Sequence, residues 1–116
     1  MAFPTGSGSE RLKYTKINAL TNSAQALITG VALHIYTVVS IIFCEQGNAA
    51  EQIQMQITDS DGSNANYLLR VTAMGAYQTF IFNDRFSFDG NKKLMTNSVA
   101  AANIDVLCTY IDQDWT

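Results

Sequence analysis

The chain has 116 residues, of which 47% are hydrophobic and 15% are charged, and its formal net charge at pH 7 is −3. This length suits one domain, and this hydrophobic content excludes a chain that is disordered throughout. The net negative charge, with no basic run longer than Lys92–Lys93, argues against a protein built to bind nucleic acid.

Residues 1–9, MAFPTGSGS, show no periodic pattern of hydrophobic residues. Their proline, glycines and small polar residues are typical of an extended arm. They also lack the charged start and apolar centre of a secretory signal peptide, so we expect Cys44 and Cys108 to remain free thiols. We therefore divide the chain into an N-terminal arm, residues 1–9, and one domain, residues 10–116.

The first two predicted strands differ in character. Residues 10–18 place Leu12 and Tyr14 opposite charged neighbours, which predicts an edge strand whose lysines oppose unwanted pairing. Residues 26–44 contain nine β-branched residues among nineteen and neither charge nor proline, which predicts one long strand, or two joined at a bulge, with Gly30 as a possible bend. The polar interruptions in this stretch argue against a membrane span.

The period of two in the 26–44 stretch divides its side chains between two faces from Val31 onward. The odd-numbered residues through Phe43 are apolar except for Thr37, so we expect them to face the core. The even-numbered residues, which include His34 and Tyr36, are mixed in character, and we expect them on the other face.

The remaining strands follow at intervals of about 8–12 residues, the spacing typical of a sandwich or barrel. Their predicted ranges are 52–57, 67–73, 77–88 (one strand or a kinked pair), 93–96 and 104–111. In the range 77–88, four phenylalanines share one face and are expected to pack in the core. The sequence thus predicts an all-β protein, an antiparallel β-sandwich of about eight strands.

Residue types that carry chemistry are few and scattered. His34 is the only histidine, and no nucleophile or acid stands near it in sequence, so a structural or interface role is favoured. The run from Asp59 to Asn64 resembles a calcium loop only in part, because the sixth position holds Asn64 and the twelfth holds Arg70. We therefore expect no enzyme activity, no metal and no cofactor.

Several features, taken together, resemble the small β-sandwich accessory proteins of tailed-phage virions. They are the arm MAFPTGSGS, the apolar run Val31 to Cys44, the strand QIQMQI over 52–57, the step Phe86, Phe88 and Gly90, and the closing strand Ile104 to Tyr110. The resemblance implies a jelly-roll-like sandwich that lies on the capsid exterior after synthesis in the host cytoplasm. It also implies a homotrimer that contacts the major capsid protein and stabilises the shell by bridging capsid subunits.

On this interpretation, partner contacts are expected from one set of residues. They are Met1, Phe3 and Pro4 in the arm, His34 and Tyr36 in the long strand, and Trp115 near the chain end. Trp115 could equally pack on its own domain, because little in the local sequence decides between the two. The alternative function is a receptor- or glycan-binding module of a phage tail or fibre, with Tyr67 or Tyr77 as the sugar platform.

Overall fold

The computed structural model describes residues 9–100 and 103–115, and these form nine β-strands without any helix. The strands are β1 (Ser9–Ile17), β2 (Gln25–Thr29), β3 (His34–Glu45), β4 (Glu51–Asp59), β5 (Asn66–Met74), β6 (Thr79–Phe82), β7 (Phe86–Asp89), β8 (Lys92–Ser98) and β9 (Ile104–Asp114). The all-β prediction is therefore confirmed. The predicted segment 77–88 contributes two strands, β6 and β7.

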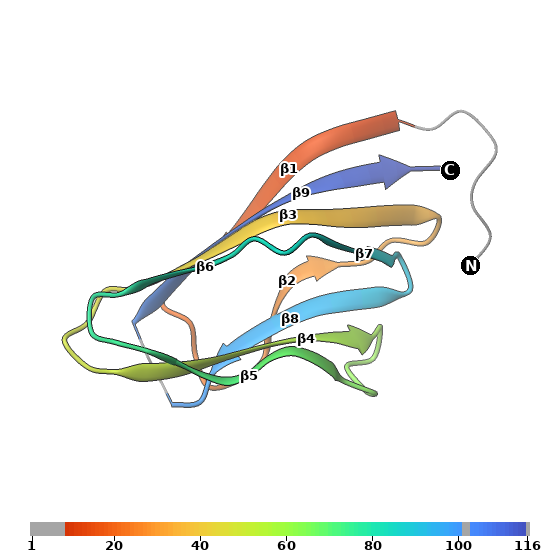
Figure 1. The fold of residues 1–116 in the computed structure, drawn as a ribbon. Helices are drawn as coiled ribbons and strands as arrows, with labels where there is room; N and C mark the ends of the chain where they lie inside the picture. The colour runs from red at the N-terminus through yellow and green to blue at the C-terminus, as the bar shows by residue number, and fades with distance from the viewer. Residues whose placement is uncertain (1–8, 101–102, 116) are drawn as a thin grey trace.

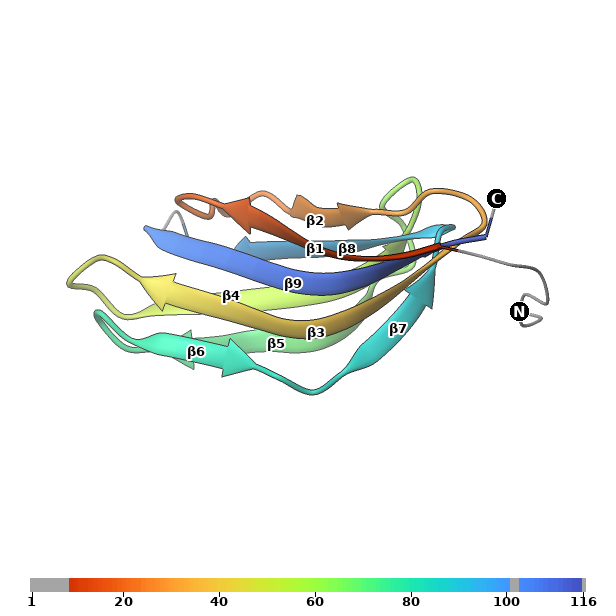
Figure 2. The same ribbon diagram turned by 90° about the horizontal axis from the view of Figure 1, so that it is seen from above.

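The strands form two antiparallel sheets that lie one over the other in a sandwich-like arrangement (Figures 1 and 2). The five-stranded sheet has the order β1-β9-β3-β6. Its fifth strand, β7, also pairs with β3, over residues 35–38, whereas β6 pairs with residues 41–44. The four-stranded sheet has the order β2-β8-β4-β5. β1 is an edge strand of the larger sheet, as its sequence predicts.

The 26–44 stretch is not one strand, nor two strands within one sheet. β2 belongs to the four-stranded sheet, and β3 belongs to the five-stranded sheet, so the chain crosses between the layers at residues 30–33. A Cβ atom at Gly30 would lie 2.3 Å from the carbonyl oxygen of Lys92, and one at Gly90 would lie 1.6 Å from that of Val31. Only glycine permits this close packing of backbone at the crossing.

The predicted faces of β3 are wrong in its first half. Tyr36 and Val38 are buried there, whereas Ile35 and Thr37 are only partly buried. The register of β3 with β9 shifts between Val38 and Ser40, which marks a bulge at Val39. Because an extra residue reverses which side faces the core, Ile41 and Phe43 are buried after the bulge, as predicted.

The core between the two sheets contains the side chains that the other alternating patterns predict. Ile53 and Met55 in β4 are fully buried, and the inward residues of β9 from Ile104 to Tyr110 are buried as well. The four phenylalanines of β6 and β7 also pack on this core. In β4 the register with β5 shifts after Met55, and Gln56 and Thr58 are buried in place of the predicted Ile57.

Candidate functional site

The outward side of the five-stranded sheet carries a largely apolar patch, and no second layer among the described residues covers it. Residues directly opposite each other in neighbouring strands share a face, so the register defines this surface. One row joins Leu12 and Ile111, the next joins Tyr14 and Thr109, and a third joins Leu107, Ile42 and Ile81. We call these seven residues the outer face.

The outer face is exposed where it reaches β1. The side chains of Leu12 and Tyr14 are 73% and 68% exposed, and Leu107 and Ile81 are exposed as well. Leu12, Tyr14 and Leu107 also line a shallow, mainly apolar hollow. Because soluble proteins rarely leave contiguous apolar area uncovered, such a patch is typical of a protein interaction site.

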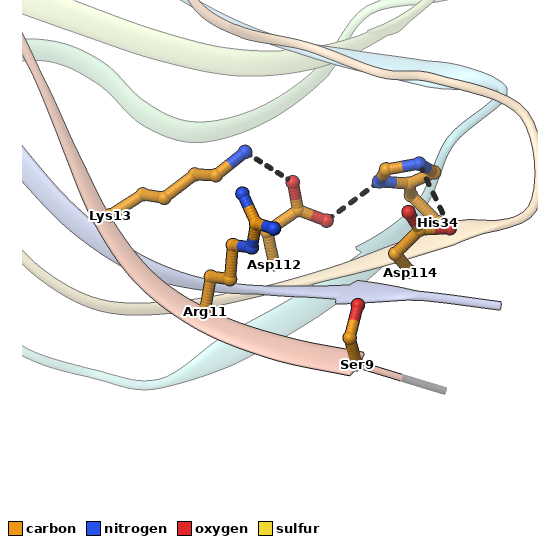
Figure 3. Close-up of a pocket in the computed structure, with 6 residues that line it drawn as sticks. All are labelled: Ser9, Arg11, Lys13, His34, Asp112 and Asp114. Carbon is orange, nitrogen blue, oxygen red and sulfur yellow. Dashed lines mark hydrogen bonds and ion pairs between the residues drawn. The ribbon is translucent and has the colours of Figure 1, made fainter. Parts of the chain in front are cut away.

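A second candidate site is a small polar pocket of about 120 Å³ at the start of β1 (Figure 3). Its lining residues come from the first residues of β1 and β3 and from the end of β9. They are Ser9, Arg11, Lys13, His34, Asp112 and Asp114. Figure 3 shows Asp112 at the centre, between the side chains of Lys13 and His34.

The interactions of Asp112 connect three strands. Its side chain is 7% exposed and accepts hydrogen bonds from Lys13 Nζ at 2.9 Å and from His34 Nδ1 at 2.7 Å. His34 Nε2 lies 3.4 Å from a carboxylate oxygen of Asp114. Burial by itself raises the pKa of Asp112, but the bonds from Lys13 and His34 outweigh it, so this pKa lies below its ordinary value of 3.8. The hydrogen bond between Lys13 and Asp112 also raises the pKa of Lys13 above 10.5.

This pocket contains paired charges and no nucleophile activated by a base. Ser9 is its only hydroxyl-bearing residue. Within the part of the chain that the structure describes, no cluster of three or more histidine, cysteine or acidic residues is suited to hold a metal ion. The arrangement can fix β1, β3 and β9 together and present charge to a partner.

The structure separates the residues expected to contact a partner. Met1, Phe3 and Pro4 lie outside the described residues. Tyr36 is 3% exposed, and its hydroxyl accepts a hydrogen bond from the backbone N–H of Val31 at 3.0 Å. It is therefore a core residue and not a surface contact, because the bulge at Val39 turns this part of β3 inward. His34 is 14% exposed and stacks on Tyr36.

Trp115 holds the end of the chain against the loop before β3. Its backbone N–H donates to the carbonyl of Leu33 at 3.0 Å, and its side chain is partly buried. The indole N–H is buried without a hydrogen-bond partner among the described residues. The Trp115 side chain therefore packs, in part, on its own domain.

The tyrosines considered for sugar stacking differ in availability. The guanidinium of Arg70 lies 4.2 Å from the ring centroid of Tyr67, so a cation–π contact occupies one face of that ring. Tyr77 is exposed in the connection between β5 and β6. Tyr77 is therefore the better platform of the two.

The two cysteines are both free thiols, as predicted. Cys108 is buried in the core, and this burial raises its pKa to about 12. Cys44 lies on the outward side of β3 and is partly buried. No helix among the described residues has the length and apolar character needed to cross a membrane.

Comparisons with known proteins place the fold but no family. No family model matches the chain, and no curated protein matches it. Among solved structures, a chain of the Bacillus endospore appendages, described as disulfide-linked pili, is similar with a TM-score of 0.56 and 10% identity, covering 100% of this chain and 97% of that one. Identity this low shows a shared fold alone.

Two viral structures are also similar. A chain from the acid-stable capsid of Helicobacter pylori bacteriophage KHP30 matches with a TM-score of 0.54 and 12% identity, covering 95% of this chain and 94% of that one. A chain of the IBDV viral particle matches with a TM-score of 0.54 and 7% identity over 90% of this chain and 31% of its own length. The sandwich is thus a jelly-roll-like fold that also occurs in subunits of large assemblies.

Sequence reasoning missed the outer face, although its signal is present. Residues 11–15 alternate between polar and apolar side chains, but alternation alone does not say which side of an edge strand faces the core. The charged residues Arg11 and Lys13 lie on the inward side, where Asp112 compensates Lys13. A charge partner 99 residues away cannot be read from a local pattern.

Proposed function

We propose that this protein is a non-enzymatic structural protein of a virion that decorates the exterior of a capsid. The observation that supports this most directly is the outer face. The sandwich already has a complete core between its sheets, yet Leu12 and Tyr14 remain exposed beside Leu107. A second apolar surface of this kind is of use mainly to a protein that contacts other proteins.

The proposed partner is the major capsid protein, and the mechanism is added interface. A standard protein–protein contact buries about 1,600 Å² in total, and the symmetry of a shell repeats each contact many times. A rigid sandwich that touches two neighbouring capsid subunits stabilises the closed shell over its separated parts. The likeness to the KHP30 capsid chain, over nearly the whole of both chains, supports this proposal.

The contacts proposed for this role are the outer face, the arm with Met1, Phe3 and Pro4, and His34 with Trp115. The arm joins the domain at Ser9, beside the polar pocket. We propose that the arm contacts the shell. We also propose that the protein acts as a homo-oligomer. The resemblance to decoration proteins implies a trimer, whereas the β1 edge of the sheet favours a dimer.

The experiment that tests this function uses capsid particles assembled without this chain. Purified protein is added, free protein is removed by sedimentation, and the bound copies per particle are counted. The proposal predicts saturable binding and a higher temperature of capsid disassembly. A chain that lacks residues 1–9 should fold normally but bind more weakly. Full occupancy by the truncated chain would contradict the role of the arm, and no binding by either chain would contradict the function.

A glycan-binding module of a tail or fibre is the second candidate, because Tyr77 is exposed in a connecting loop. Aromatic rings of this kind stack on sugars when polar groups stand beside them. A glycan array probed with the full chain distinguishes the two functions. Specific hits that Tyr77→Ala abolishes would favour glycan binding. An array without hits would count against glycan binding and would leave capsid decoration as the remaining proposal.

A further inference from the structure

Among the described strands, none pairs with the outer edge of β1. Within the described part of the chain, β9 is the only strand that pairs with β1, and β1 ends the five-stranded sheet. Figure 1 shows β1 along the border of this sheet, with β9 on one side of it only. A nine-residue edge of this kind can hydrogen-bond to an extended segment of another chain.

The outward residues of β1 are self-complementary when a second copy of the strand runs antiparallel to the first. These residues are Glu10, Leu12, Tyr14 and Lys16, which the register places on the same side as the outer face. With Lys13 opposite Lys13 of the other copy, Leu12 lies opposite Tyr14. In the same register Glu10 lies opposite Lys16, and the two-fold axis repeats both pairs.

We propose that two copies of this chain associate edge to edge through β1 in this register. Each dimer then contains two apolar Leu12–Tyr14 pairs and two ion pairs between Glu10 and Lys16. The outer faces of both copies join into one continuous surface. The occupant of the β1 edge is therefore a second copy of the chain.

On the inward side of β1, Lys13 lies opposite Lys13 of the second copy across the two-fold axis. The repulsion between these two ammonium groups has to be reduced for the dimer to form. Its ammonium group already forms an ion pair with Asp112 at 2.9 Å, which reduces the repulsion between the two lysines. Arg11 lies opposite Thr15 in this register, so no other pair of like charges is opposed. An inward lysine without such a partner would instead protect the edge from pairing.

This inference goes beyond the proposed function, since it concerns the free protein. It also replaces the trimer: a two-fold contact at β1 yields a dimer, whereas a threefold would need two different surfaces on each copy. The experiment below uses no capsid particles. Its failure would therefore leave the decoration function standing, and failure of capsid binding would leave the dimer standing.

Charge reversal tests the register. Glu10 and Lys16 are six residues apart on one strand, about 20 Å, so they cannot pair within a chain. Either Glu10→Lys or Lys16→Glu turns both ion pairs of the dimer into repulsive pairs, and we expect dimerisation to weaken by about tenfold or more. The double variant Glu10→Lys/Lys16→Glu restores opposite charges and should dimerise like the natural chain.

A mixture of the two single variants gives the sharpest result. Glu10→Lys chains carry two lysines and Lys16→Glu chains carry two glutamates at these positions, so a mixed dimer regains both attractive pairs. Sedimentation velocity over a concentration series should show each variant largely monomeric and their mixture dimeric at twice the 12.7 kDa chain mass. Circular dichroism checks that each variant is folded. A monomeric natural chain, a trimer, or a dimer that ignores both reversals would overturn the proposal.

Discussion

Replacement of Asp112 by asparagine should destabilise the sandwich, because this buried carboxylate joins three strands. Asp112 lies in β9, Lys13 in β1 and His34 in β3, and its bonds to them are 2.9 and 2.7 Å long. A hydrogen bond to a charged group contributes about 1.5–3 kcal/mol, and asparagine keeps one acceptor oxygen while losing the charge. We expect Asp112→Asn to lower the free energy of unfolding at pH 7 by about 2 kcal/mol.

The dependence of this loss on pH follows from the direction of the pKa shift. The pKa of Asp112 in the folded protein is below 3.8, so its contribution is present above that pH and disappears as the pH falls through the folded pKa. The pKa of Lys13 is raised above 10.5, so its part of the contribution is complete below that pH and disappears as the pH rises through the folded pKa.

Urea unfolding of both proteins, measured from pH 7 down to pH 3, tests this reasoning. The gap in unfolding free energy between the natural chain and Asp112→Asn should narrow as the pH falls below 3.8. Asp84→Asn is the matched control, since Asp84 is exposed in the connection between β6 and β7. An equal loss in both variants, or a gap that does not narrow below pH 3.8, would refute the account of Asp112.

Three further predictions concern other parts of the chain. Gly90→Ala should cost about 3 kcal/mol or more in urea unfolding, since its Cβ would lie 1.6 Å from the Val31 carbonyl oxygen; an unchanged midpoint would contradict this crossing. A thiol reagent should label Cys44 first and Cys108 only on unfolding, because burial raises the Cys108 pKa to about 12; equal rates would count against this. At a concentration where the chain is monomeric, Leu12→Ser should change stability by less than about 0.5 kcal/mol, because Leu12 is largely exposed; a larger loss there would mean that Leu12 packs on its own domain.

The strands could be predicted from the sequence where hydrophobic alternation is regular. Ile53 and Met55 in β4, and the inward side chains of β9, occupy the core as their pattern indicates. The faces of β3 could not be predicted throughout. A bulge at Val39 depends on how β3 pairs with β9, which is a property of two strands and not of one.

The candidate site was less predictable than the fold, because its residues are distant in sequence. The sequence singled out His34 but gave no sign that Asp112, 78 residues away, would bond to it. The sequence around Leu12 and Tyr14 predicts an edge strand, yet their exposure depends on which side of β1 meets the other sheet. Alternation supplies the two faces of a strand, and only tertiary packing decides which of them is buried.

The central claim, that the outer face is an interaction surface, is tested most directly by comparing two leucines of similar exposure. Leu12 lies on the outer face and is 73% exposed, whereas Leu33 is 68% exposed in the loop before β3. Binding of Leu12→Ser and Leu33→Ser to capsid particles assembled without this chain is measured by sedimentation. The account predicts a marked loss of occupancy for Leu12→Ser alone. Equal occupancy of both variants and the natural chain would contradict it.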